Sequence, residues 1–131
     1  MIKRVIEFNK TVIGITNRIP RALESEEAGW LARALSEEVE EFETAHKNGD
    51  FIGSIDAMFD TIYFAIGGLV RMGLSEKMIE EIFEAVHNCN MTKVRGVKEG
   101  REVQHDLDAV KPENWESPEV HIIRILEASN E

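Results

Sequence analysis

Two short breaks divide most of this chain into long segments of helical periodicity. Asn48-Gly49 and Gly73 are typical helix ends, and an Asp or Ser that can cap a new helix follows each within two residues. Loops this short require consecutive helices to run antiparallel. The sequence therefore predicts an up-down-up array of three helices, over residues 25–47, 51–72 and 76–90.

Shorter elements are expected on either side of this array. After Lys93 the helical periodicity fails, and Pro118 suits the first position of a last helix. The predicted elements are a helix over 2–15, a loop over 16–24, a strand over 101–105 and a last helix over 118–127. We predict one all-α domain over residues 1–131, with a four-helix core, an irregular C-terminal tail and a short last helix.

Composition limits the possible partners. A chain of 131 residues with 43% hydrophobic residues builds one core, and its net charge of −10 repels nucleic acid. The longest apolar stretch, residues 57–70, contains Asp60 and is too short to span a membrane. Cys89 is the single cysteine, which suits a reducing compartment. We expect a cytoplasmic protein without nucleic acid or membrane partners.

Carboxylates interrupt the apolar stripes of two helices. On the first, Glu38 occupies a core position, and Glu41 lies beside it three residues on. Its apolar stripe consists of Leu31, Leu35, Phe42 and Ala45. Glu40 and Glu43 are interpreted as solvated, because runs of Glu on helices usually face water.

The next helix repeats this pattern. Asp56 and Asp60 lie beside an apolar stripe formed by Ile52, Ile55, Phe59, Ile62, Ile66 and Leu69. An unpaired buried carboxylate is costly, so such a cluster requires a partner. Glu38, Glu41, Asp56 and Asp60 are expected to converge and to bind Mg²⁺ or Mn²⁺, which prefer oxygen ligands.

The run Glu37-Glu38-Val39-Glu40-Glu41, followed by Asp56-Ala-Met-Phe-Asp60, resembles the all-α nucleotide pyrophosphohydrolases of the MazG-like superfamily. Further similarity to its phage-type branch, akin to phosphoribosyl-ATP pyrophosphohydrolase, extends over nearly the whole chain. It is carried by Asp60-Thr-Ile-Tyr63-Phe-Ala-Ile-Gly67, by Val86-His-Asn-Cys-Asn90-Met-Thr-Lys93 and by Lys111-Pro112.

The resemblance implies hydrolysis of a nucleoside triphosphate between its α- and β-phosphates, with Mg²⁺ bound by Glu38, Glu41 and Asp60. Many relatives carry a Glu where this chain has Ala57, so Asp56 would serve instead. Glu37, about 100° round the helix from Glu38, could orient or deprotonate the attacking water. The catalytic candidates are therefore Glu37 and Glu38.

The resemblance also indicates residues that would bind the substrate. Lys93 and Lys111 would contact phosphate oxygens, and Asn90 would hold the phosphates or the Lys93 loop. Base discrimination is expected in a pocket near the first helix and the loop after it, with Asn9, Asn17 and Trp30 as candidates. The phage-type resemblance favours the deoxynucleotide pool and a purine such as dGTP.

The residues leave two other classes of protein open. A carboxylate-bridged di-iron bundle needs two Glu-x-x-His pairs, and Glu43…His46 and Glu84…His87 have this spacing, although their helical angles point away from the cluster. A non-catalytic acidic interaction module would use aromatic side chains such as Trp30 and Phe83.

The second of the three long helices is apolar around most of its circumference, so one helical layer cannot cover it. We expect a partner subunit there, in a homodimer or homotetramer, with Gly67-Gly68 allowing close approach of the helices.

Overall fold

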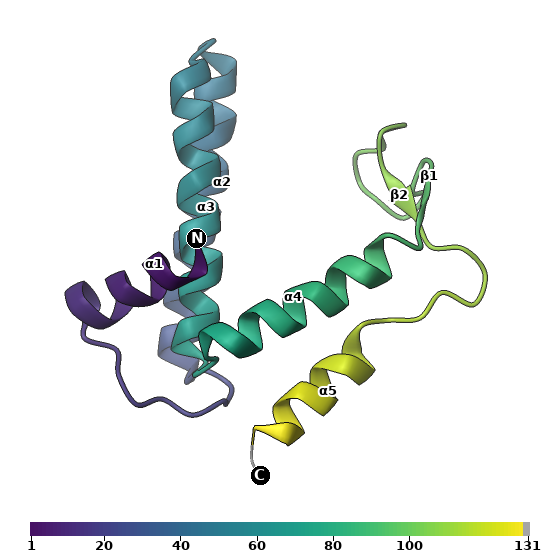
Figure 1. Ribbon diagram of the computed structural model, residues 1–131. Coiled ribbons are helices and arrows are strands. Elements are labelled where there is room, and N and C mark those ends of the chain that lie inside the picture. Colours follow the sequence, from purple (N-terminus) through teal and green to yellow (C-terminus); the bar gives the residue numbers. More distant parts are fainter. Residues whose placement is uncertain (130–131) are drawn as a thin grey trace. The chain divides into compact units, whose positions relative to one another are not determined.

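The computed structural model describes residues 1–129 and shows a chain built mostly of helices (Figure 1). The elements are α1 (Ile2–Phe8), a π-helix (Asn9–Ile13), α2 (Ser25–Lys47), α3 (Phe51–Arg71), α4 (Glu76–Asn90), β1 (Val94–Arg95), β2 (Ala109–Val110) and α5 (Glu119–Ala128). The predicted all-α class is confirmed. The chain forms two compact units, Met1–Glu76 and Lys77–Glu131, which are described separately.

The first unit is built on the antiparallel pair of α2 and α3, with α1 packed against α3 (Figure 1). Asp50 caps α3 as predicted, because its Oδ1 accepts a hydrogen bond from the Gly53 N–H at 2.8 Å. Gly73 follows α3 with a φ of 85°, a left-handed conformation that suits glycine. Since α4 lies almost wholly in the second unit, its place in the predicted up-down-up array stays a prediction.

The predicted first helix is not a regular α-helix to residue 15. It is α-helical to Phe8 and then widens into the π-helix, which ends at Gly14 with a φ of 84°. A π-helical turn accommodates an additional residue per turn, and the sequence offered no signal for this change of pitch.

Small side chains let α2 and α3 approach closely. Ala57, Gly67 and Gly68 are buried on α3, and a Cβ added at Gly68 would lie 2.6 Å from Leu31 Cδ2 of α2. A Cβ added at Gly67 would lie 3.3 Å from Nδ2 of Asn9 in the π-helix. Both glycines therefore serve contacts within this chain, so their predicted role at a partner subunit is wrong.

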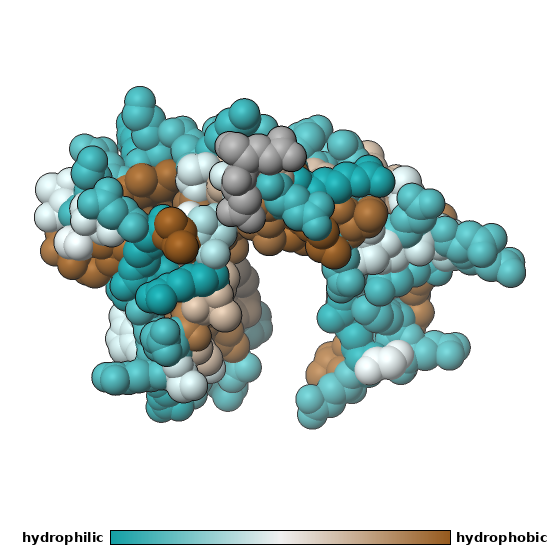
Figure 2. Space-filling view, turned by 90° about the horizontal axis from the view of Figure 1, so that it is seen from below, coloured by the Kyte–Doolittle hydropathy of each residue, from teal (hydrophilic) through white to brown (hydrophobic). Residues whose placement is uncertain are grey.

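The predicted apolar stripe of α3 faces largely away from α2. Ile52 and Phe59 are 75% and 60% exposed, and Ile55 and Ile62 are also exposed. Gly68 and Asp60 lie on the side of α3 that meets α2, where they approach Leu31 and Glu38 respectively. Apolar side chains consequently reach the surface of the molecule (Figure 2).

By length and composition, α3 is the one helix of the described chain that could cross a membrane. This is weak support, because the central helix of a soluble protein passes the same test. Here α3 carries Asp56 and Asp60 and packs along α2.

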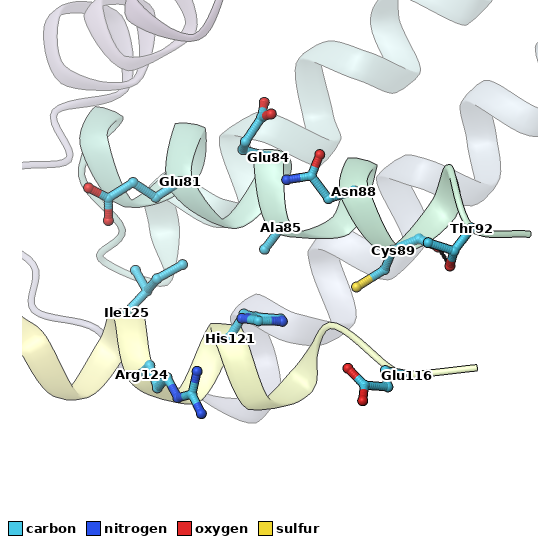
Figure 3. Close-up of a pocket in the computed structure, with 10 residues that line it drawn as sticks. All are labelled: Glu81, Glu84, Ala85, Asn88, Cys89, Thr92, Glu116, His121, Arg124 and Ile125. Atoms are coloured by element: carbon cyan, nitrogen blue, oxygen red, sulfur yellow. Dashed lines mark hydrogen bonds between the residues drawn. The ribbon is translucent and has the colours of Figure 1, made fainter. Parts of the chain in front are cut away.

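The second unit contains α4, α5 and a two-stranded antiparallel ribbon. The predicted strand over residues 101–105 is wrong, because the ribbon pairs Val94 with Val110 and Arg95 with Ala109, and residues 101–105 lie in the loop between them. A groove of about 610 Å³ separates α4 from α5 and is lined by Ala85, Cys89, His121 and Ile125 among others (Figure 3). The last helix is confirmed to within one residue.

Candidate metal centre and substrate cavity

Three carboxylates from two helices meet at one point of the first unit. Glu38 and Glu41 share one side of α2 because they are three residues apart, and α3 brings Asp60 up to them. One carboxylate oxygen from each side chain lies within 4.8 Å of the other two. Three of the four carboxylates that were expected to converge therefore do so.

Glu38 is the buried member of this cluster. It is 8% exposed, and its Oε2 has no hydrogen-bond partner. Burial, a hydrogen bond with Glu41, and the charges of Glu41, Asp60 and Asp56 raise the pKa of Glu38 to about 7. A buried polar atom without a partner calls for a ligand or an ion to satisfy it.

Asp60 is half-buried, and Asp56 is exposed beside the cluster. Burial, followed by the charges of Asp56 and Glu41, raises the pKa of Asp60. Asp56 is outside the group of three, but it lines an acidic groove of about 510 Å³ together with Glu37 and Glu41. The Asp56 carboxylate thus adds negative charge at the edge of the three-carboxylate cluster.

This cluster fits a hard divalent cation. Three carboxylates supply the oxygen ligands that Mg²⁺ and Mn²⁺ prefer, and a cation would give Glu38 Oε2 the partner it lacks. It would also relieve the repulsion that raises the pKa of the carboxyl groups.

A cavity of about 540 Å³ with aromatic walls opens onto Glu38 and Asp60. Phe8, Asn9, Ile13, Trp30, Leu31, Glu38, Asp60, Tyr63, Phe64, Gly67 and Arg71 line it. Phe8 packs edge-to-face on Tyr63 at 5.3 Å between centroids, and Trp30 packs likewise on Phe64 at 6.0 Å. Such walls accept a flat aromatic group beside the carboxylates.

Asn9 is buried at the point where α1 changes to the π-helix. Its Nδ2 donates a hydrogen bond to the Val5 carbonyl at 2.9 Å. Gly67 leaves room for this amide, because a Cβ there would lie 3.3 Å from Nδ2. The sequence placed Asn9 and Trp30 in one pocket, and both line this cavity.

Sequence reasoning missed Arg71, which completes the cavity. Its guanidinium lies 4.3 Å from the centroid of the Trp30 ring, and its Nη1 lies 3.2 Å from Glu27 Oε1. Arg18 donates to the same Glu27 oxygen at 2.6 Å, and its hydrogen bond lowers the pKa of Glu27. Sequence reasoning also did not assign Phe8, Tyr63 or Phe64 to the cavity that they line.

Glu37 lies in the acidic groove and not in the aromatic cavity. It is exposed, and its Oε1 is 3.6 Å from Arg33 Nε one turn earlier. Asn17 lines a separate, smaller cavity of about 180 Å³, because the chain after Gly14 runs to the end of α3. The structure therefore does not bring Asn17 to Asn9 and Trp30.

The predicted phosphate-binding residues lie in the second unit. Asn90 is the exposed last residue of α4, and its carbonyl accepts a hydrogen bond from the Lys93 N–H at 3.0 Å. Lys93 and Lys111 both lie over the ring of Trp115. The structure thus gathers the two lysines at one aromatic side chain.

Both Glu-x-x-His pairs are solvent-exposed on their own helices, whereas a di-iron site is built in the core of a helix bundle. Glu43 and His46 are exposed on α2, and Glu84 and His87 are exposed on α4. Among residues 1–129, the cluster close enough to share a metal ion consists of carboxylates alone, without histidine.

Comparison with known protein families matches residues 5–90, about two thirds of the chain, to the family described as phosphoribosyl-ATP pyrophosphohydrolase. This span includes the carboxylate cluster and every residue that lines the aromatic cavity, and it ends before Lys93. Among curated proteins, none matches the chain with significant similarity. The chain therefore belongs to the phosphoribosyl-ATP pyrophosphohydrolase family, within the MazG-like superfamily of nucleotide pyrophosphohydrolases.

Proposed function

We propose that this protein hydrolyses a (deoxy)nucleoside triphosphate to the monophosphate and pyrophosphate, with Mg²⁺ as the native cation and Mn²⁺ as a substitute. The observation that carries the proposal is the buried, unpartnered Oε2 of Glu38 within a cluster of three carboxylates beside an aromatic-walled cavity. Membership of a pyrophosphohydrolase family supports the reaction class.

Glu38, Glu41 and Asp60 would hold the cation, and Asp56 would add charge from the rim. When bound, the cation neutralises phosphate charge and lowers the pKa of bound water. Glu37 lines the groove that also contains Glu41 and Asp56, and we assign it the role of orienting or deprotonating the attacking water.

The aromatic cavity would take the nucleobase. A base between these walls lies next to Glu38 and Asp60, so its phosphates can reach the cation. Asn9 is fixed through Nδ2 to the Val5 carbonyl, which leaves Oδ1 as an acceptor for a base that carries a hydrogen-bond donor. Guanine has such donors, consistent with a preference for dGTP.

We also propose that the protein is a cytoplasmic homodimer or homotetramer. In the described chain no large side chain is completely buried, while the outer face of α3 exposes Phe51, Ile52, Ile55, Met58, Phe59 and Ile62. An apolar face of this kind marks an interaction surface. A second copy can pack the same face against itself about a twofold axis.

A substrate panel tests the reaction. The common NTPs and dNTPs, and phosphoribosyl-ATP, are incubated with Mg²⁺ or Mn²⁺, and the products are resolved by chromatography. We expect pyrophosphate and a monophosphate, and no turnover after chelation. Inorganic phosphate with a diphosphate would mean attack at the γ-phosphorus and would refute the assignment.

Two further results would favour the other classes of protein. Tightly bound iron with an oxo-type absorption band would indicate a di-iron protein. Absence of turnover with every nucleotide and cation would indicate a non-catalytic module.

A further inference from the structure

The ribbon of the second unit places two lysines opposite each other. Val94 pairs with Val110 and Arg95 with Ala109, so continuing the register by one residue brings Lys93 opposite Lys111. Residues opposite each other in an antiparallel pair carry their side chains on the same face, and like charges there repel. This arrangement needs a compensating interaction.

Trp115 supplies part of that compensation. The Lys93 Nζ lies 5.0 Å from the centroid of its ring and the Lys111 Nζ lies 4.8 Å from it. The ring is held in place, because its Nε1–H donates to the Cys89 carbonyl of α4 at 2.9 Å and its backbone N–H donates to the Pro112 carbonyl at 3.1 Å. One anchored ring thus positions both ammonium groups.

No carboxylate neutralises these lysines within the described residues. The salt bridges there do not include Lys93 or Lys111, although Glu113 and Glu116 flank Trp115 in sequence. Asp108, which directly precedes β2, forms a salt bridge with Arg101, because its Oδ2 lies 2.6 Å from Arg101 Nε. In a chain with a net charge of −10, two gathered and unneutralised ammonium groups favour an anionic ligand.

We propose that Trp115 is a positioning residue that organises Lys93 and Lys111 into a binding site for a phosphate group of a di- or triphosphate. Ammonium groups bind phosphate as point charges, and a fixed pair avoids part of the entropy cost of ordering two flexible side chains. The identity of the natural ligand, a nucleoside triphosphate or its pyrophosphate product, rests on the proposed function.

The test uses inorganic pyrophosphate and the full-length protein in chelator-treated buffer, where the carboxylate cluster can only repel the anion. Calorimetry gives the affinity, and the indole Nε1–H resonance of Trp115, assigned by its loss in Trp115→Phe, reports on the ring. We expect binding and a shift of that resonance. Lys93→Met, Lys111→Met and Trp115→Leu should each weaken binding by roughly tenfold.

Two variants separate positioning from general destabilisation. Trp115→Phe keeps a ring and should retain more affinity than Trp115→Leu. Lys98→Met removes an exposed lysine of the loop between the two strands and should leave the affinity unchanged. Unchanged binding in folded Trp115→Leu, or no binding by the wild type, would overturn this site. Nucleotide hydrolysis is measured separately, so turnover without pyrophosphate binding refutes the lysine site alone, and binding without turnover refutes the proposed reaction alone.

Discussion

Glu38 of α2 and Asp60 of α3 bring carboxylate oxygens within 4.8 Å of each other across the helix pair. Both side chains also line the aromatic cavity, so one pair of residues connects the cation site with the space for a base. Their proximity is unfavourable without a cation, because burial and like charge raise the pKa of both groups.

Neutral isosteres of the two carboxylates should abolish turnover and stabilise the cation-free protein. Glu38→Gln and Asp60→Asn keep the side-chain shape but remove a charge that repels its neighbours, and Glu41→Gln should likewise abolish turnover. We expect melting temperatures at or above that of the wild type without Mg²⁺. Glu43→Gln makes the same charge change on an exposed part of α2 and should keep full activity. Near-normal turnover in Asp60→Asn would remove the basis of the proposed site.

The cation-free protein should lose stability as pH rises from 4.5 to 7. The folded-state pKa of Glu38 is raised from 4.5 to about 7, so the folded state binds more protons than the unfolded state in this window. The contribution of the Glu38 carboxyl to the free energy of unfolding is therefore larger at pH 4.5 than at pH 7, by on the order of 1–3 kcal/mol. Urea unfolding at several pH values measures the change, and Glu38→Gln should lack this contribution.

Protons and the cation compete for the same carboxylates. At limiting Mg²⁺, turnover should therefore decrease as the pH is lowered from 7. Raising the Mg²⁺ concentration should move the pH–rate profile towards lower pH. A profile independent of Mg²⁺ concentration would contradict this competition.

Asn9→Asp should destabilise the protein and change the base ranking. It replaces the donor to the Val5 carbonyl with a buried acceptor, at a cost of about 1–3 kcal/mol. The ratios of kcat/KM across the nucleotide panel should change more than the kcat of the best substrate. Asn17→Asp, outside the cavity, serves as the control and should keep the ranking.

Phe59→Glu should convert the oligomer into a monomer. Phe59 lies on the outer face of α3, and a charge there would be buried between two copies. Light scattering at micromolar concentration measures the mass. Val103→Glu changes an exposed residue of the ribbon loop and should leave the mass unchanged. A wild-type monomer would refute the predicted interface.

Gly73→Ala should destabilise the fold by about 1 kcal/mol or more, because alanine is strained at positive φ. A Cβ there would also collide with the backbone carbonyl of Ile19. Gly100→Ala is the matched control, since its Cβ would meet no atom within 4 Å and its φ is not positive. Thermal unfolding of both variants provides the comparison.

Local patterns in the sequence determined α2, α3, α4 and α5 with their ends, and the interrupted stripe of α2. The spacing of Leu31, Leu35, Glu38 and Phe42 assigned Glu38 to the core, because helical periodicity places residues three and four apart on one face. The Asn48–Asp50 break was enough to make α2 and α3 antiparallel, and that brought Asp60 to Glu38 and Glu41.

Only the tertiary structure decided which face of α3 packs against α2. The largest apolar side chains formed the clearest stripe, but Gly68 meets Leu31 of α2 and Gly67 meets Asn9 of the π-helix, because a residue without a side chain permits a close approach. Likewise, the pairing of Lys93 with Lys111 on Trp115 depends on a strand register between residues far apart in sequence. Helical periodicity determines neighbours within a segment, whereas contacts between segments depend on packing that no local pattern encodes.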